Sequence, residues 1–436
     1  MVSVSPSSGS PRNPWAWVPT LYFGQGIPYV AVMTLSVVLY KNLGVSNTDI
    51  AFYTSWLYLP WVIKPLWSPV VDFFRTKRWW IVTLQLVVGA ALALVAITVP
   101  GPVFFKLTLA MFWLLAFSSA THDIAADGFY LLALPQHQQA AFVGVRSTFY
   151  RLAMLGGQGG LVYLAGALTE WSGDVRQAWV IVFGVLAGFF ALLATLHFFV
   201  LPKPVADGPV PRRAEFFADY FAVFAEFFRK PGIGRILGFL LLYRLAESQL
   251  LKLATPFLLD GREAGGLGLS TKQVGIFYGT IGPVALTLGG LLGGWVISRV
   301  GLKKMLWPMV AAMNVPNTVF VLLAAWQPTQ LVWVGSAVAV EQFGYGFGFT
   351  AYMVYLMMIA RGPQQTAHYA LGTGFMALGM MLPGMAAGWI QDQLGYVNFF
   401  WWVLLATVPS FAACAWVKIE DGFGKKAAAA VEPAAE

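Results

Sequence analysis

Residues 293–304 read GGWVISRVGLKK, and this stretch connects two long apolar segments of the chain. Its glycines would let two helices approach closely, as small residues commonly do in membranes. Arg299, Lys303 and Lys304 come at the end of the first apolar segment. Basic residues at the ends of apolar spans are typical of cytoplasmic loops. The stretch therefore predicts a short basic loop between two packed transmembrane helices.

An earlier stretch, SPVVDFFRTKR at residues 68–78, keeps the basic cluster without the glycines. LGVSNTDIAF at residues 43–52 similarly matches LGLSTKQVGIF at residues 267–277. In both copies a loop ends in a serine, Ser46 or Ser270, that can cap the following helix. These repeats predict that the chain is built from two related halves.

The composition indicates a membrane protein. The 436-residue chain is 58% hydrophobic and 11% charged, whereas a soluble domain carries about 25% charged residues. Several apolar runs reach the ~20 residues that a helix needs to cross a bilayer. Strands of a membrane barrel would instead alternate in polarity over about 10 residues. We expect an all-α integral membrane protein with twelve transmembrane helices, at residues 15–40, 47–70, 79–99, 103–132, 141–168, 176–201, 234–259, 271–298, 304–325, 330–359, 367–391 and 396–417.

The longest interval between spans, residues 202–233, divides the chain into an N-terminal six-helix half at 15–201 and a C-terminal six-helix half at 234–417. It begins with a Pro-rich linker and continues with AEFFADYFAVFAEFFRKPG. That mixture of aromatic and acidic residues predicts a helix at the membrane interface. We expect polar tails at residues 1–14 and 418–436.

The net charge of +8 comes largely from short loops between the expected spans. The side of the termini carries most of the basic loop residues. The opposite side carries only Lys41, Lys106, Arg176, Arg262 and Lys272. The positive-inside rule then places both termini in the cytoplasm and explains the charge without a nucleic-acid partner. The single cysteine, Cys414, excludes an intrachain disulfide or a cysteine metal cluster. We expect no cofactor and no metal.

Ionisable side chains inside a span cost about 2.5–3.5 kcal/mol or more and default to functional candidates. Asp123 and Asp127 stand four residues apart in the fourth span, and so on one helix face. The fourth and fifth spans are joined by a short turn. Counted in residues from that turn, Arg146 and Arg151 of the fifth span lie at the same depth in the membrane as the two aspartates. We interpret these four residues as a proton-coupling network, because carboxylates close together favour proton binding and arginines oppose it.

The internal repeat offers a test of this interpretation. Asp123, Asp127 and Arg151 align with the uncharged Phe349, Met353 and Ala377 of the second half. A charge cluster that occurs in one half only favours a functional role over scaffolding. The alternative is an ion-pair network that merely ties two helices together.

The seventh span carries a basic stripe that suits an anionic substrate: Arg244 and Lys252, with Glu247 beside them. The alternative is an internal Arg244–Glu247 pair, with Lys252 reaching the outer surface. Further candidates for substrate binding are Gln25, within the GQGIP stretch of the first span, Tyr22 shortly before it, and Glu341, Gln342 and Tyr345 of the tenth span. Glycines with a proline predict a broken helix of the kind that lines transport sites, or alternatively an ordinary kink.

GGWVISRVGLKK resembles the signature of the major facilitator superfamily, whose members are built from two six-helix halves that rock about a central site. The resemblance implies that the basic loops, together with the carboxylate of Asp72, control the opening of the protein at one face of the membrane. The gating residues would be Asp72, Lys77, Arg78, Arg299, Lys303 and Lys304.

Three motifs resemble the AmpG-type muropeptide permeases of that superfamily: ATHDIAADGF at 120–129, FYRLAML at 149–155 and LLYRLAES at 241–248. The resemblance implies a proton symporter that imports anhydromuropeptides, which are cell-wall sugar-peptide fragments, across the bacterial inner membrane. Where that family continues its fourth helix with Trp, Lys and a further Asp, this chain has Phe129, Tyr130 and Leu131.

We therefore expect a permease whose partners are the lipid bilayer, protons and a small sugar-peptide, acting as a monomer. The alternative is a permease for another amphiphilic or anionic solute, such as an acetyl-CoA-like compound, a siderophore or a drug. A membrane-embedded enzyme or sensor is a remote alternative. The chain has four histidines and one cysteine, and its sequence offers neither a catalytic constellation nor a long soluble segment.

Overall fold

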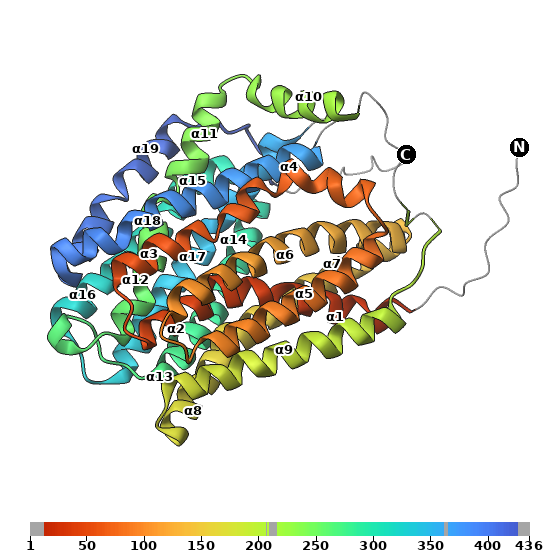
Figure 1. Ribbon diagram of the computed structural model, residues 1–436. Helices are drawn as coiled ribbons and strands as arrows, with labels where there is room; N and C mark the ends of the chain where they lie inside the picture. Colours follow the sequence, from red (N-terminus) through yellow and green to blue (C-terminus); the bar gives the residue numbers. More distant parts are fainter. Residues whose placement is uncertain (1–12, 206, 209–215, 362–364, 426–436) are drawn as a thin grey trace, which may run out of the picture.

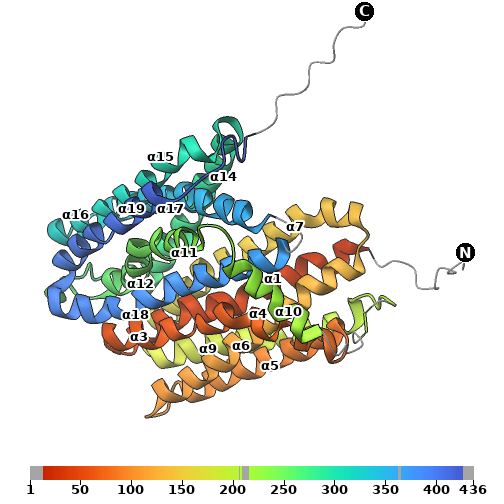
Figure 2. The same cartoon turned by 90° about the horizontal axis from the view of Figure 1, so that it is seen from above.

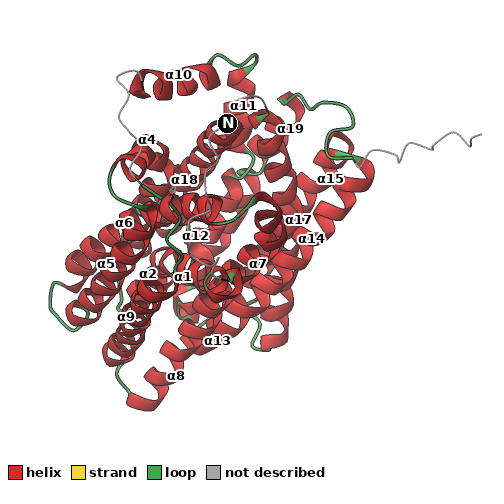
Figure 3. Ribbon diagram, turned by 90° about the vertical axis from the view of Figure 1, so that its right-hand side faces the viewer, coloured by secondary structure: helices red, strands yellow, loops and turns green. Residues whose placement is uncertain are grey.

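The computed structural model describes residues 13–205, 207–208, 216–361 and 365–425, which form helices joined by short loops (Figures 1 and 3). The α-helices are α1 (Val18–Val30), α2 (Ser36–Asn42), α3 (Asn47–Trp56), α4 (Leu59–Phe73), α5 (Lys77–Thr98), α6 (Phe104–Ala133), α7 (Gln136–Leu155), α8 (Val162–Ser172), α9 (Val175–Val200), α10 (Phe216–Phe228), α11 (Ile233–Leu242), α12 (Leu245–Leu259), α13 (Thr271–Ile276), α14 (Gly282–Val300), α15 (Leu302–Asn314), α16 (Thr318–Trp326), α17 (Leu331–Ala360), α18 (Gln365–Leu405) and α19 (Val408–Trp416). Three π-helical turns continue neighbouring helices: η2 (Ala31–Leu35), η3 (Gly156–Leu161) and η5 (Phe277–Ile281).

Nine helical segments within the described residues are long and apolar enough to cross a membrane. One of them, Ala367–Trp416, bends at Gly395, where φ is 70°, and so makes two crossings. The pairs α3–α4 and α11–α12 are each interrupted by a short turn, which leaves pieces too short to qualify alone. With these pairs the crossings number twelve, as the sequence predicts.

The crossings form two groups, α1 to α9 and α11 to α19, which lie side by side in Figure 2. Each group has its own apolar core. Two buried clusters centre on residues of the first group, such as Phe112 and Phe129. Two others centre on residues of the second, such as Phe257 and Tyr352. An even number of crossings returns the chain to the face where it began, so α1 starts and α19 ends on the same side, here called the termini side.

The two repeated loops end in the predicted caps. The Ser46 hydroxyl accepts a hydrogen bond from the backbone N–H of Asp49 at 3.0 Å. The Ser270 hydroxyl likewise accepts from Gln273, whose side chain bonds back to the Ser270 N–H at 2.9 Å. A serine at this position satisfies a donor that the first helical turn would leave free, so both helices start where the sequence indicates.

The connection between the groups contains α10, which lies at the margin of the bundle near α4 and α11 (Figure 1). The Tyr220 hydroxyl bonds to Pro65 and Ser68 of α4. At the other end of α10, Phe227 packs on Phe375 of α18. The helix therefore bridges the two groups.

The glycine-rich stretch packs α14 closely against α17. A Cβ added at Gly289 would lie 2.1 Å from the carbonyl oxygen of Phe343. The same atom at Gly346 would lie 2.0 Å from that of Leu286. Only glycine fits where two helix backbones come this close. Within the 293–304 stretch, a Cβ at Gly293 would lie 2.9 Å from the carbonyl oxygen of Phe347, so this glycine has the predicted packing role. Gly294 points away from this contact and has open space around it.

This difference between the glycines predicts opposite effects of substitution. Gly289→Ala forces α14 and α17 apart, and we expect overpacking to cost at least about 1–3 kcal/mol. Gly294→Ala is expected to be neutral or stabilising, because alanine favours the helix by about 1 kcal/mol. The thermal unfolding midpoints of the two purified variants measure this. Equal midpoints would contradict the assignment of Gly289 to a backbone contact.

Candidate functional site

A central cavity of about 750 Å³ lies between the two groups of helices. This volume is within the range of small-molecule sites, which is roughly 300–1,000 Å³. Its wall is a mixture of aromatic, methionine, hydroxyl and basic side chains. Tyr29, Tyr58, Trp61, Lys64, Arg151 and Gln158 come from the first group, and Arg244, Ser248, Lys252, Tyr278, Gln342, Tyr345 and Phe349 from the second.

The helices around the cavity are irregular at the cavity itself. The π turns contribute Thr34, Gln158 and Tyr278 to the wall. Tyr58 stands in the turn between α3 and α4, and Arg244 in the turn between α11 and α12. Non-helical backbone at membrane depth is tolerated where it lines a cavity rather than lipid. The interruptions therefore face the cavity rather than lipid.

The cavity wall is basic. Lys64, Arg151, Arg244 and Lys252 line it, and no Asp or Glu is among the described residues that do. The Arg244 guanidinium donates to the Tyr345 hydroxyl and stacks over Phe349, 4.6 Å from the ring centroid. Charges concentrated in a low-dielectric cleft attract counter-ions. The arrangement suits an anionic solute with aromatic or sugar-like faces.

Lys252 points inward and not to the outer surface. Its ammonium group donates to the Thr54 hydroxyl at 2.9 Å and lies 5.6 Å from the centroid of the Tyr58 ring. Both partners belong to the first group of helices, so Lys252 spans the interface between the groups.

The structure separates Glu247 and Glu341 from the cavity wall. Both are fully buried behind it. Glu341 accepts a hydrogen bond from Gln342 at 2.9 Å, and neither oxygen of Glu247 has a hydrogen-bond partner among the described residues. Of the residues predicted to bind substrate, Arg244, Lys252, Gln342 and Tyr345 line the cavity. Tyr22, Gln25, Glu247 and Glu341 do not.

Asp127 forms one part of the predicted charge network. It pairs with Arg146 at 2.9 Å and accepts a hydrogen bond from the Tyr22 hydroxyl at 3.2 Å. The Arg146 guanidinium stacks on Tyr22 and Tyr130, with centroid distances of 4.5 and 5.2 Å. The two side chains of the ion pair are 46% and 29% exposed, so solvent screens this interaction.

Asp123 has different surroundings. Its carboxylate accepts a hydrogen bond from the Trp61 indole at 3.2 Å and lies close to Gln25 and Lys64. Arg151, which the sequence places in the same network, lines the cavity instead, and within the described residues no carboxylate is in ion-pair distance of it. Five residues turn a helix by about 140° beyond one full turn, so Arg146 and Arg151 cannot both face the aspartates. The predicted four-residue network is therefore divided.

The GQGIP stretch does not break the first span. Helix α1 continues to Val30 with Pro28 inside it, and the π turn η2 follows directly. A Cβ at Gly26 would lie 2.7 Å from that of Ala153, and one at Gly24 would lie 2.5 Å from Leu193. The glycines therefore serve close packing with α7 and α9, and the interruption follows the proline.

The predicted gating loops lie on the termini side. The backbone N–H groups of Lys77 and Arg78 donate to Asp207 at 2.6 and 3.0 Å, which places a carboxylate at the positive end of α5. Lys303 pairs with Asp421 at 2.6 Å, and Arg299 lies 5.6 Å from the Trp295 ring. Lys304 is exposed. The side chain of Asp72 lies outside the part that the structure describes.

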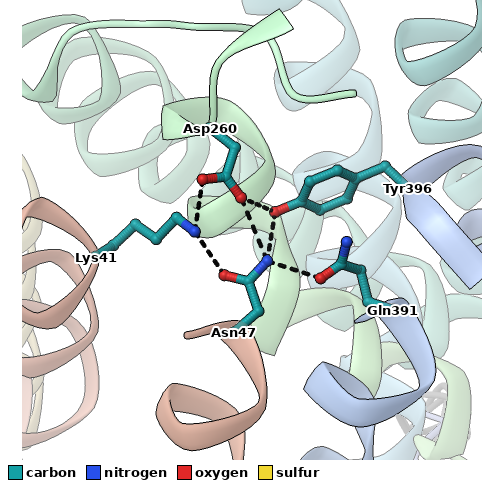
Figure 4. Close-up of polar contacts among 5 residues, drawn as sticks. All are labelled: Lys41, Asn47, Asp260, Gln391 and Tyr396. Atoms are coloured by element: carbon teal, nitrogen blue, oxygen red, sulfur yellow. Dashed lines mark hydrogen bonds and ion pairs between the residues drawn. The ribbon is translucent and has the colours of Figure 1, made fainter. Parts of the chain in front are cut away.

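On the opposite side, a polar cluster joins the two groups of helices (Figure 4). Lys41 pairs with Asp260 at 2.5 Å and donates to Asn47 at 2.7 Å. The Asn47 amide donates to Gln391 and Tyr396 at 2.7 and 2.9 Å, and the Tyr396 hydroxyl donates to Asp260 at 2.5 Å. We call these five residues the latch.

Further contacts close the same end. Asn42 bonds to Thr271 at 2.9 Å, Thr48 to Asp392 at 2.5 Å, and Lys272 pairs with Glu170 at 3.0 Å. All of them join the first group of helices to the second. The cavity is therefore shut on the side opposite the termini.

Lys64 and the aromatic wall are cavity residues that the sequence analysis missed. Lys64 is an ionisable residue inside the expected span 47–70, which is the signal used for the other candidates. Tyr29, Trp61 and Tyr278 carry no such signal, because aromatic residues are equally common on packed and lipid-facing surfaces.

Residues 20–372 match the model of the Major Facilitator Superfamily. The chain is 28% identical over 399 residues to the anhydromuropeptide permease of Escherichia coli (strain K12), with 89% of this chain and 76% of that protein covered. It is 26% identical to the putative transporter AmpG 4 of Rickettsia conorii, covering 88% and 92%. An uncharacterized protein of Haemophilus influenzae is 27% identical, with 91% and 92% covered.

Solved structures of several transporters share the fold. The nucleoside transporter NupG superposes with a TM-score of 0.65 at 17% identity, covering 92% of this chain and 98% of that one. A D-xylose-proton symporter superposes with a TM-score of 0.65 at 14% identity, covering 94% and 98%. The likeness at this identity concerns the fold alone.

The latch predicts how the two faces exchange access. Asp260→Asn removes the charge partner of Lys41, whose side chain is 13% exposed, and loss of one partner from a buried pair costs about 3–5 kcal/mol. We expect a cysteine at Thr34, on a Cys414→Ser background, to react at least about tenfold faster with an impermeant maleimide applied to the face opposite the termini. Glu170→Gln removes a half-exposed pair and is the control, with a much smaller change. An unaltered rate in Asp260→Asn would show that the latch does not hold this end closed.

Proposed function

The chain belongs to the Major Facilitator Superfamily, and from this membership we propose that it is a proton-coupled importer of anhydromuropeptides. Secondary transporters of this fold bind their solute near the bilayer midplane, between two halves that rock about it. The relatives named as anhydromuropeptide permeases or AmpG transporters support the choice of solute. The protein is a multi-pass membrane transporter and not an enzyme.

The observation that carries the proposal is the basic, aromatic cavity. A sugar-peptide has at least one peptide carboxylate and a sugar ring. Arg244, Lys252, Lys64 and Arg151 supply four cations for the carboxylates. The tyrosine and tryptophan rings of the wall supply flat surfaces for the sugar, and Gln158 and Gln342 supply hydrogen bonds.

Within this cavity we assign the anchoring role to Arg244. It is 94% buried and its guanidinium lies against the rings of Tyr345 and Phe349, so this planar group is held ready for a two-point bond to a carboxylate. Lys252, Gln342 and Tyr345 adjoin it on the wall. Tyr22 and Gln25 act behind the wall, on Asp127 and Asp123 respectively.

We further propose that Asp123 takes part in proton coupling. It lies beside Trp61 and Lys64, and both of these residues line the cavity. Lys64 can therefore respond to a bound anion and change its attraction for the carboxylate. Asp127 and Arg146 form the neighbouring pair, and Arg151 faces the solute.

The proposed setting is a bacterial inner membrane with both termini in the cytoplasm. The basic loops at Lys77, Arg78, Arg299, Lys303 and Lys304 support this orientation through the positive-inside rule. The N-terminal half would span residues 15–201, the connection 202–233 and the C-terminal half 234–417. The latch then closes the outer face, and the basic loops, with Asp72, act at the inner one.

The test is uptake of a labelled anhydromuropeptide into proteoliposomes, with and without an imposed proton gradient. We expect gradient-driven accumulation by the wild type. Arg244→Gln is expected to weaken solute binding at least about tenfold, because charge-assisted hydrogen bonds contribute about 1.5–3 kcal/mol. Asp123→Asn is expected to abolish the response to the gradient.

The matched control is Lys106→Gln, which removes an exposed basic residue that does not line the cavity. Its uptake should equal that of the wild type. Absence of uptake by folded wild type would reject the muropeptide assignment and favour another amphiphilic anion, because the same cavity chemistry accepts one. Equal wild-type uptake with and without the proton gradient would reject proton coupling.

A further inference from the structure

Two carboxyl groups meet inside the second group of helices. Glu247 stands in the first turn of α12, directly after the interruption at Arg244, and Glu341 stands in the middle of α17. Both side chains are 0% exposed. The two charged neighbours of Glu247 are Glu341 and Arg244.

The pair lacks the hydrogen bonds that buried carboxylates require. Neither oxygen of Glu247 has a partner, and one oxygen of Glu341 has none. The hydroxyl of Tyr278 is also buried without a partner, and it lies near both carboxyl groups. Ionised carboxylates buried in this way are strongly destabilised unless they are paired.

Among the described residues, Arg244 is the cation that balances the two acids. Arg244 acts on Glu247, although its own hydrogen bond goes to Tyr345. The phenols of Tyr278 and Tyr345 lie near both carboxyl groups, and Tyr58 lies near Tyr278 and Arg244. Lys252 lies on the same helix as Glu247 but is directed to Thr54. One arginine can compensate one carboxylate, so the other carboxyl group must be neutral.

We propose that Glu247 and Glu341 form a proton-binding site of the C-terminal half and hold at least one proton in this conformation. Two like charges so close together cannot both be ionised. The proton belongs to the pair rather than to either residue. This role replaces the substrate contacts that the sequence suggests for both glutamates, which lie behind the cavity wall.

The position of Arg244 links this proton to the solute. Arg244 lies on the cavity wall and also balances Glu247. An anion that binds Arg244 withdraws that compensation, which favours a second proton on the pair. By linkage, a proton on the pair equally favours the anion. Release of the solute returns Arg244 to Glu247 and expels the proton, so solute and proton travel together.

This inference rests in part on the proposed function, since coupling needs an anionic solute. The proton site itself does not depend on the identity of that solute. The experiment is infrared spectroscopy of the full-length protein in lipid nanodiscs at neutral pH. We expect a carbonyl-stretch band from a protonated carboxyl group in the substrate-free wild type.

Glu341→Gln leaves Glu247 with Arg244 as its counter-charge and is expected to lose that band. Glu247→Gln removes one of the two acids that share the proton and is expected to weaken the band. Arg244→Gln is expected to roughly double the band, because neither acid then has a counter-charge. Glu263→Gln, at an exposed turn between α12 and α13, is the control and should leave the spectrum unchanged. Asp123→Asn reports separately on the first group of helices.

Addition of an anhydromuropeptide to the wild type is expected to increase the band. A wild type that shows the band without any response to this solute supports the proton site and counts against the muropeptide assignment. A band that is undiminished in both glutamine variants overturns the proton site, whatever the solute. If one glutamine variant fails to fold, the other and Arg244→Gln still decide the question.

Discussion

The close approach of helix backbones across the interface between the two groups is the constraint on which this structure depends. A Cβ on Gly279 would lie 2.0 Å from the carbonyl oxygen of Gln158, and one on Gly388 would lie 2.1 Å from that of Asn47. A Cβ on Gly159 would in turn lie 2.8 Å from the carbonyl oxygen of Gly279. Because these contacts involve backbone, they hold the groups close together at the end that carries the latch. The latch forms at this end because its side chains can reach one another only where the two groups of helices are close together.

That one-sided closure decides where the charges of the protein lie. Behind the latch the groups diverge and leave a cavity that four basic side chains enter. Acidic side chains are withdrawn from the wall into the helix groups, as Glu247 and Glu341 illustrate. The second group thus places its acids one layer behind its bases. A bound anion meets the cations directly and the carboxylates only through them.

The sequence predicts the twelve spans closely, because apolar runs of bilayer length permit few alternatives, and it also predicts both serine caps. Its predictions for the site are less complete. Asp127 meets Arg146 as expected, but Arg151 turns into the cavity, because depth along a helix is easier to count than rotation about it. Lys64 was missed although it carries the same signal of an ionisable residue in a span. The unpartnered state of Glu247 depends on how α12 and α17 pack, which no local pattern reveals.

The interruptions of the helices connect these observations. A turn such as the one at Tyr243–Arg244 exposes backbone polar groups, which lipid cannot satisfy, so it is stable only beside a polar cavity. The same turn directs Arg244 to the cavity and starts α12 so that Glu247 lies behind it. The second group therefore carries its proposed proton site where its backbone is least regular. In the second half, the residue equivalent to Asp123 is Phe349, and its ring packs against the Arg244 guanidinium. The two halves share a scaffold but place their acids differently, so substitution in one half should not be compensated by the other.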